Sequence, residues 1–290
     1  MLKSVDVSDA LHASTQLIET EGRTLAYRSV GEGIPVVLCT RFRATLDDWD
    51  PGFLDALAGH GFRVITFDYS GFGRSTGRMS YNPAEMAADP LDLIRGLGLK
   101  DVVLGGWSIG GMAAQVAMVQ APDLIRALVL IGTTPPGELV KMAEPLFYEL
   151  AGKEVNDFED VVGLFFQPRS EASRAAAARS QARIEARMEA MPDDRSPPVP
   201  IEFARARIAG GPANPAFPAP QVLEALKTTR VPILHIGGDH DIIFPVENWY
   251  ALNGLLPTTT LVTYPAAGHG PQHQHPELSA AIIAGFVGDH

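Results

Sequence analysis

A serine enclosed by glycines near the middle of the chain limits the possible folds more than any other feature. The apolar run that begins at Val102 is short and β-branched at its start, which is typical of a buried strand. Residues Met112–Gln120 carry apolar side chains at helical spacing. Gly106 and Gly110 lack the Cβ atoms that would collide in a tight connection. The sequence therefore predicts that Ser108 stands on a sharp turn between a strand and a helix.

This turn has the chemistry of a nucleophilic site. The first N–H groups of a helix have no intrahelical partner, so the N–H of Ile109 would face an oxyanion that forms beside Ser108. The segment Gly106-Trp107-Ser108-Ile109-Gly110 fits the G-x-S-x-G pattern of a nucleophilic serine turn. Trp107 and Ile109 flank the serine, and we expect both to contact the substrate. The alternative is a glycine-rich turn with an incidental serine.

The rest of the chain alternates strand-like and helix-like segments. Strands are predicted at Gln16–Thr20, Arg23–Val30, Val36–Cys39, Arg63–Asp68, Ile125–Gly132, Val231–Gly237 and Thr259–Tyr264. Helices are predicted at Asp50–Ala58, Pro83–Leu97, Val246–Leu255 and Pro276–Val287. Residues 1–15 are expected to form a loose or short helical arm. This alternation predicts an α/β fold, with a mostly parallel central sheet flanked by helices.

The alternation stops in the second half of the chain. Residues 133–229 contain no strand-like run, and helix-like stretches such as Ser170–Met191 lie between proline-rich breaks. We therefore expect a helical cap at 133–229, inserted between a first core segment at 1–132 and a second at 230–290. Its apolar residues that could line a substrate pocket are Leu146, Phe147, Phe165 and Phe166, and we expect at least half of them to pack in the core of the cap instead.

A serine hydroxyl needs a base, and the base needs an orienting group. Ligands bind where the carboxyl ends of parallel strands meet, so the partners of Ser108 are expected after later strands. Asp239 and Asp241 follow the strand that resumes the core, and His269 follows the last strand. The chain thus offers one histidine and two aspartates at the edge of the sheet where Ser108 is expected.

With these residues in place, the chain is identified as a member of the α/β-hydrolase fold superfamily over Gln16–Val287. It resembles that family at four motifs that occur in the family's order: Asp68–Ser75, Gly106–Gly110, Gly238–Asp241 followed by Pro245, and Gly268-His269. The resemblance implies that Ser108 is the nucleophile, that His269 is the general base, and that Asp241 orients His269. Asp239 is the rival acid, but the second aspartate is the usual match in this family.

The chain departs from the family after the third strand. Many relatives carry His-Gly there, whereas this chain has Thr40-Arg41-Phe42-Arg43. By alignment, the backbone N–H of Phe42 takes the place of the second oxyanion donor. Arg41 either points a cation into the site, toward a carboxylate or other polar substrate group, or pairs with Asp47 or Asp48 as scaffold. We favour the paired arrangement, because most loop arginines near acids are paired.

Other residues that could carry chemistry have a structural interpretation. His273 and His275 have no acidic or cysteine partner nearby in the sequence, so we expect a solvated loop and no metal site. Cys39 lies within an apolar run and is expected to be an inert core thiol. Asp68 and Asp239 are expected to form turns by bonding local backbone.

Composition limits the partners. The formal net charge is −11, from 23 basic and 34 acidic residues, which argues against nucleic acid or an anionic membrane surface as a partner. The chain has one cysteine, no secretory-type apolar segment in its first 16 residues and no apolar run of about 18 residues. We therefore expect a cytoplasmic protein, as a monomer or homodimer, without a membrane span.

Together these patterns predict a cofactor-independent serine hydrolase that cleaves a carboxylic ester, lactone or thioester through an acyl-enzyme. Its substrate is expected to be a small molecule with an apolar portion. A carbon–carbon bond hydrolase or a perhydrolase would use the same three residues. A ligand-binding homologue without catalysis is a further alternative, because the His-Gly pair is replaced. A dehalogenase is disfavoured, since it would need a carboxylate in place of Ser108.

Overall fold

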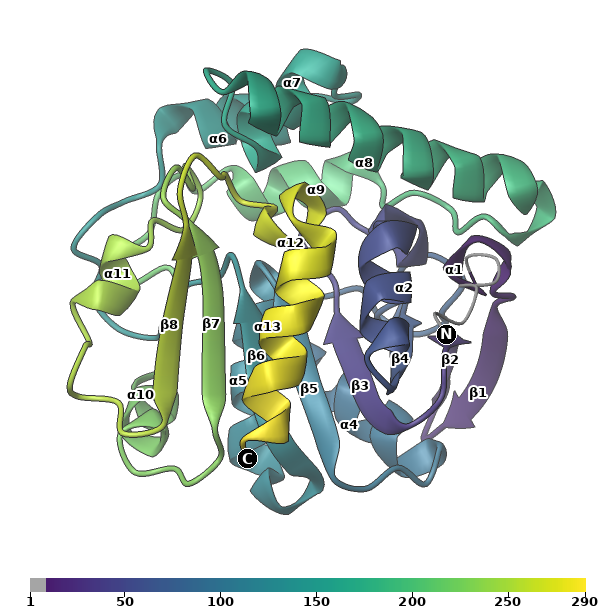
Figure 1. The fold of residues 1–290 in the computed structure, drawn as a ribbon, viewed down its shortest axis with the longest axis horizontal. Coiled ribbons are helices and arrows are strands. Elements are labelled where there is room, and N and C mark those ends of the chain that lie inside the picture. The colour runs from purple at the N-terminus through teal and green to yellow at the C-terminus, as the bar shows by residue number, and fades with distance from the viewer. Residues whose placement is uncertain (1–8) are drawn as a thin grey trace, which may run out of the picture.

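The computed structural model describes residues 9–290, and its centre is one eight-stranded sheet. The strands are β1 (Gln16–Thr20), β2 (Arg23–Val30), β3 (Ile34–Cys39), β4 (Phe62–Phe67), β5 (Val102–Trp107), β6 (Ile125–Ile131), β7 (Ile233–Gly238) and β8 (Thr259–Tyr264). Their order in the sheet is β1-β2-β4-β3-β5-β6-β7-β8 (Figure 1). β2 pairs antiparallel with β1 and β4, and every other pair is parallel. The predicted mostly parallel α/β fold is therefore confirmed.

The helices lie on both faces of the sheet and beyond one edge. They are α1 (Asp9–His12), α2 (Pro51–Gly59), α3 (Pro83–Met86), α4 (Ala88–Gly96), α5 (Ile109–Gln120), α6 (Pro145–Ala151), α7 (Phe158–Phe165), α8 (Glu171–Ala190), α9 (Ile201–Ile208), α10 (Pro220–Leu226), α11 (Glu247–Tyr250), α12 (Pro271–Gln274) and α13 (Pro276–Gly288). Short 3-10 turns occur at η1 (Leu46–Asp48), η2 (Pro122–Leu124) and η3 (Pro192–Asp194). None of the helices within residues 9–290 is long and apolar enough to cross a membrane.

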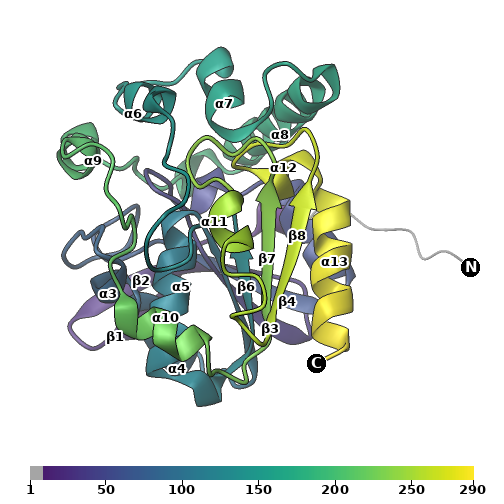
Figure 2. The same ribbon diagram turned by 90° about the vertical axis from the view of Figure 1, so that its left-hand side faces the viewer.

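The central strands are buried on both faces, and alternate side chains enter two separate cores. In β3, Val37 and Cys39 join the core beneath α3, α4 and α5, whereas Val36 and Leu38 join the core beneath α2 and α13. Figure 2 shows α13 on one side of the sheet and α5 and α10 on the other. The unbroken apolar sequence of such strands follows from this burial, because neither face is exposed to water.

Residues 133–229, for which we keep the name cap, form helices that mostly lie beyond the sheet. Figures 1 and 2 show α6, α7, α8 and α9 in a layer beyond the carboxyl ends of the parallel strands. α10 lies in the same expected segment, but it packs against α5 at the side of the sheet. The layer of α6 to α9 therefore faces the strand ends where the predicted site residues lie.

The structure differs from the predicted elements in a few places. The helix predicted at 83–97 is divided into α3 and α4 at Ala87, and Pro90 falls in the first turn of α4, where a missing N–H costs nothing. The helix predicted at 246–255 is limited to the four residues of α11, and turns follow it. Of the predicted arm at 1–15, residues 1–8 lie outside the described residues.

Candidate active site

Ser108 occupies the tight strand-to-helix turn that the sequence predicts. Its φ is +60°, in a region that L residues rarely adopt, and its N–H donates to the Ile131 carbonyl at 3.0 Å. A Cβ on Gly106 would lie 2.3 Å from the Gly110 carbonyl oxygen, and one on Gly110 would lie 2.3 Å from the Cys39 carbonyl oxygen. Both glycines are therefore required by close backbone contact.

His269 and Asp241 form a buried pair at the ends of neighbouring strands β8 and β7. The His269 Nδ1 lies 2.8 Å from the Asp241 Oδ2, and the other carboxylate oxygen accepts the N–H groups of Ile243 at 2.8 Å and Phe244 at 2.9 Å. Burial raises the pKa of Asp241, but His269 and these two N–H groups outweigh it and leave the pKa below its usual value. Asp241 is therefore an ionised partner for the imidazole.

Asp239 has a different role from Asp241. Its carboxylate is solvent-exposed and accepts the N–H of Ala267 at 3.3 Å, so it bonds nearby backbone as a turn former would. The acid that reaches His269 is thus the second aspartate of the Gly-Asp-x-Asp motif.

Ser108 and His269 line the same cavity, which has a volume of about 330 Å³. Within the described residues, no hydrogen bond joins the Ser108 hydroxyl to the His269 imidazole. Such bonds commonly tighten only when a substrate is bound. The His269 ring packs near the rings of Phe165 (6.0 Å between centroids) and Phe244 (5.7 Å), so the site side of the imidazole is bordered by apolar groups.

Two backbone N–H groups beside Ser108 are available to an oxyanion. Ile109 is the first residue of α5, so its N–H has no intrahelical acceptor. Phe42 lies in a turn closed by a hydrogen bond from the Ala44 N–H to the Arg41 carbonyl at 3.3 Å. Phe42 and Ile109 both line the cavity, and neither N–H has an acceptor within residues 9–290. These are the two donors expected from the sequence.

Arg41 lines the cavity and is also paired, so it combines the two expected alternatives. Its guanidinium contacts the Asp48 carboxylate at 2.6 Å and donates to the Phe42 carbonyl at 2.9 Å. It also stacks over the rings of Trp107 and Phe165. The partner is Asp48, whereas Asp47 contacts Arg28 at 2.7 Å.

Trp107 does not contact the cavity as expected, because its side chain points to the other side of the strand end. The indole is 1% exposed, packs against the rings of Trp49 and His273, and donates its N–H to the His269 carbonyl at 2.8 Å. Trp107 therefore holds the backbone of the loop that carries His269. The signal that could have found this direction is the alternation of side chains along a strand, which places neighbouring residues on opposite sides.

The expectation of a solvated loop around His273 is wrong. His273 lies in α12, is 5% exposed, and accepts the Asp50 N–H at its Nε2 (3.3 Å). Burial lowers its pKa to about 4, so it is neutral. His275 is half-buried beside the Tyr264 ring. Among the described residues, no group of three histidine, cysteine, aspartate or glutamate side chains is placed to hold a metal ion.

Cys39 and Asp68 are both fully buried. Burial raises the pKa of the Cys39 thiol to about 12, which agrees with an inert core thiol. Asp68 accepts the Arg74 N–H from its own loop (2.9 Å), but it also accepts the Leu46 N–H (2.8 Å) and the Ser196 hydroxyl (2.7 Å). The Asp68 carboxylate therefore bonds its own loop and also two segments that are distant in the sequence.

The cavity wall is mainly apolar and is built by both cap and core. The larger apolar side chains that line it are Phe42, Ile109, Met112, Phe147, Val161, Leu164, Phe165, Ile208, Ile243 and Phe244. Of the four apolar cap residues that the sequence offers, Phe147 and Phe165 line the cavity, whereas Leu146 is exposed and Phe166 is buried in the cap. Arg43, which also lines the cavity, was missed, although it directly follows Phe42 in the sequence.

Comparison with known proteins agrees with this geometry. Residues 34–276 match the family model described as alpha/beta hydrolase fold, and the chain belongs to this family. It is 29% identical over 260 residues to the bifunctional esterase/perhydrolase DCH of Acinetobacter calcoaceticus, which covers 83% of this chain and 87% of the relative. It is 28% identical over 285 residues to the non-heme chloroperoxidase of Streptomyces lividans, covering 92% of this chain and 97% of the relative.

A solved structure shows the same architecture. The alpha/beta hydrolase fold protein from Chitinophaga pinensis superposes with a TM-score of 0.78 at 29% sequence identity, covering 97% of this chain and all of that one. The relatives thus include esterase and haloperoxidase members, which supports a hydrolase.

Proposed function

We propose that the protein is a cofactor-independent serine hydrolase that cleaves an ester-like bond through an acyl-enzyme. The observation that carries this proposal is the Asp241–His269 hydrogen bond of 2.8 Å at the wall of the cavity that Ser108 also lines. A structural turn with an incidental serine would not need an ionised, buried acid behind a histidine at the same cavity.

In the proposed mechanism, the Ser108 oxygen attacks the substrate carbonyl while the His269 Nε2 takes the serine proton. Asp241 accepts the Nδ1–H of His269, which selects the required tautomer and stabilises the imidazolium that forms. The N–H groups of Phe42 and Ile109 donate to the oxyanion of the tetrahedral intermediate. His269 then protonates the leaving group, and water, activated by His269, releases the acyl group from Ser108.

The cavity supports a small substrate with an apolar portion. Its apolar residues come from the turn of residues 41–44, which we call the oxyanion turn, from α5, from the cap and from the loop after β7. The paired state of Arg41 and Asp48 leaves little net charge at that part of the wall. We therefore infer that the acyl or alcohol part of the substrate is apolar, and that carboxylic esters, lactones and thioesters are the bond types to test.

Perhydrolysis is a second candidate, because the relative from Acinetobacter calcoaceticus is named as both an esterase and a perhydrolase. In that reaction hydrogen peroxide takes the place of water in the attack on the acyl-enzyme, and the acyl group leaves Ser108 as a peracid. The Ser108 chemistry is otherwise identical, so the two activities differ only in the second nucleophile.

The proposal is tested with a fluorophosphonate probe and a panel of p-nitrophenyl esters, lactones and thioesters of graded chain length. We expect the probe to label Ser108, as read by mass spectrometry, and the Ser108→Ala variant to lose both labelling and turnover. Rates with added hydrogen peroxide separate perhydrolysis from hydrolysis. Normal turnover by Ser108→Ala would remove Ser108 from the mechanism, and an unlabelled, inactive wild type would favour a ligand-binding homologue.

A further inference from the structure

The Phe42 N–H is carried by a turn whose shape fixes its direction. The Arg41 carbonyl accepts the Ala44 N–H at 3.3 Å, so Phe42 and Arg43 are the central residues of the turn. The Arg41 carbonyl and the Phe42 N–H belong to one planar peptide unit, so any contact that holds the turn also aims the N–H. Arg43 has a φ of +58°, in the region that favours glycine, which means that the turn needs support from outside.

The Arg43 side chain supplies this support from the cap. Its guanidinium donates to three carbonyl oxygens, that of Ala151 at the end of α6 (2.8 Å) and those of Lys153 (2.7 Å) and Glu154 (3.0 Å) just after it. The last carbonyls of a helix have no intrahelical partner, so a cation is well placed there. These contacts tie the oxyanion turn of the core to one cap segment, residues 151–154.

The core holds the same turn from the other side. The Arg43 N–H donates to the Tyr81 hydroxyl at 3.0 Å, and the Tyr81 ring packs 4.6 Å from the Phe42 ring. The turn is thus fixed between Tyr81 in the core and the end of α6 in the cap.

A second arginine provides an internal comparison. Arg205 of α9 donates its Nε–H to the Gly152 carbonyl at 3.0 Å, so it binds the same cap segment as Arg43. Arg205 is exposed, and no hydrogen bond joins it to the oxyanion turn within the described residues. Both arginines satisfy carbonyls of residues 151–154, but only Arg43 connects them to Phe42.

We propose that Arg43 is a positioning residue that couples the placement of the cap to the direction of the oxyanion N–H of Phe42. This inference rests on the proposed serine-hydrolase function, since it assumes that an oxyanion forms at that N–H. If α6 moves away from the strand ends, the three hydrogen bonds of Arg43 break together and the strained turn loses its support. The second oxyanion donor is therefore in place only when the cap is seated over the cavity.

The test compares Arg43→Gly, Arg43→Lys and Arg205→Met with the wild type. Glycine suits the φ of the turn but removes the side chain, so a role limited to backbone shape predicts no loss of activity. We expect Arg43→Gly to lower kcat by about 10- to 100-fold with little change in KM, less than the effect of deleting a whole oxyanion donor. Arg43→Lys should recover part of this loss, because a lysine can still reach one or two carbonyls.

A second measurement separates positioning from stability. A trifluoromethyl ketone forms an oxyanion on Ser108, whereas the carboxylate product does not. We expect Arg43→Gly to weaken binding of the ketone by the same factor as kcat and to leave product inhibition unchanged. Arg205→Met removes a hydrogen bond from the same cap segment, so it should lower the thermal unfolding temperature while its kcat stays within about threefold.

The outcomes are distinct. If Arg43→Gly retains kcat and ketone affinity within about threefold of an active wild type, or if Arg205→Met lowers kcat equally, the coupling is wrong although the hydrolase function stands. If Arg43→Gly does not fold, Arg43→Asn carries the test, because asparagine tolerates a positive φ and is too short to reach the three carbonyls. Wild-type kcat and ketone affinity in that variant would overturn the proposal. A wild type that neither turns over esters nor reacts at Ser108 contradicts the proposed function itself.

Discussion

At the scale of single residues, the turn at Ser108 is determined by space for the backbone. A Cβ on Gly110 would lie 2.3 Å from the Cys39 oxygen and 2.5 Å from the Thr40 oxygen, and backbone atoms cannot rotate away. The glycines of the motif are therefore read correctly from the sequence, because the tight connection allows no other residue.

Gly110→Ala is expected to lower the free energy of unfolding by about 3 kcal/mol or more, because the new methyl group overlaps two carbonyl oxygens. Gly285→Ala is the matched control: Gly285 is exposed in α13 with no atom within 4 Å of an added Cβ. We expect this control to raise the free energy of unfolding by about 0.5–1 kcal/mol. Urea unfolding of both variants checks this, and equal stability of the two would contradict the steric argument.

The two aspartates of the Gly-Asp-x-Asp motif are a second comparison at this scale. Asp241→Asn replaces the acceptor of the His269 Nδ1–H with an amide, which allows the wrong tautomer and leaves an imidazolium without its partner. We expect kcat to fall by about 10⁴-fold. Asp239→Asn alters only an exposed contact with the Ala267 N–H, so its kcat should stay within about threefold. Initial rates with a p-nitrophenyl ester measure both. A larger loss of kcat in Asp239→Asn than in Asp241→Asn would show that Asp239, and not Asp241, is the acid that supports His269.

The positions of residues that follow a strand are the most predictable from the sequence. Ser108, Asp241 and His269 each follow a strand, so the topology of a parallel sheet brings them to one edge. The environments of Trp107 and His273 are not predictable in this way, because they are formed by distant segments. The aromatic cluster that buries His273 includes Trp49, more than 200 positions away, and no local pattern signals such a contact.

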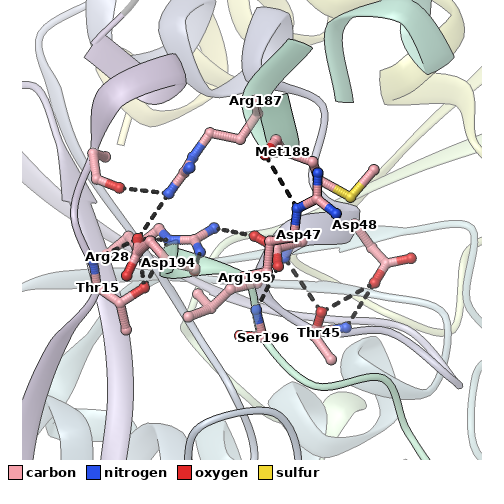
Figure 3. A network of polar contacts seen from close by, with 12 residues as sticks. Thr15, Arg28, Thr45, Asp47, Asp48, Arg187, Met188, Asp194, Arg195 and Ser196 are labelled. Atoms are coloured by element: carbon pink, nitrogen blue, oxygen red, sulfur yellow. Dashed lines mark hydrogen bonds and ion pairs between the residues drawn. The ribbon is translucent and has the colours of Figure 1, made fainter. Parts of the chain in front are cut away.

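At the scale of elements, a polar network holds the segment after α8 against the core. Figure 3 shows Arg28 of β2 and Arg187 of α8 converging on Asp194, with Asp47 and Ser196 beside them. The Ser196 N–H donates to Asp47 at 2.7 Å, and its hydroxyl donates to Asp68 at 2.7 Å. Asp68 thus connects the loop after β4 with the cap segment.

Asp68 is expected to make stability depend on pH. Burial raises the pKa of Asp68 to about 6, although three hydrogen bonds and the charge of Arg28 act to lower it. An unfolded aspartate has a pKa of about 4, so between about pH 4 and pH 6 the folded state binds more protons than the unfolded state. The free energy of unfolding should therefore fall as pH rises through this window, by an amount on the order of 3 kcal/mol from Asp68, and level off above it.

The measurement is the pH dependence of urea unfolding in the wild type and in Asp68→Asn. The variant should be less stable throughout, because its amide group meets the N–H donors of Leu46 and Arg74, and it should lack the part of the slope that Asp68 contributes. An unchanged slope between pH 4 and pH 6 would show that Asp68 does not titrate there.

Most strands and the long helices were predictable, because periodicity and capping residues mark them. The short elements were not. α11 ends after four residues although the apolar pattern continues, since the following residues form turns that pack Leu252 and Leu256 onto the core. The pattern of apolar residues shows which side chains are buried, but not whether the backbone between them is helical.

At the scale of the whole molecule, the cap and the core are joined by apolar contacts, such as those of Leu150 and Leu164 with Ile243, and by charged side chains at a few points. α8 lies across the molecule beyond the strand ends (Figure 1), and its Arg183 binds the N-cap residue of α2, Asp50, through two contacts of 2.7 and 2.5 Å. Asp50 is fully buried, whereas Arg183 is partly exposed. The position of the cap could not be predicted from the sequence, because both partners are separated by 133 residues.

Arg183→Met should therefore lower the free energy of unfolding without changing kcat. The change leaves the buried Asp50 carboxylate without its cation, and breaking a buried pair in this way costs about 3–5 kcal/mol, reduced here because Arg183 is partly exposed. Arg174→Met is the matched control on the same helix, since its partner Glu159 is exposed, and it should destabilise the protein far less than Arg183→Met. Neither Arg183 nor Arg174 lines the cavity, so kcat at a temperature where both variants are folded should match the wild type. Urea unfolding together with steady-state kinetics checks this. Equal stability of the two variants would show that the Asp50–Arg183 pair does not hold the cap. A selective loss of kcat in Arg183→Met would show that the position of the cap over the cavity depends on α8 as well as on the end of α6.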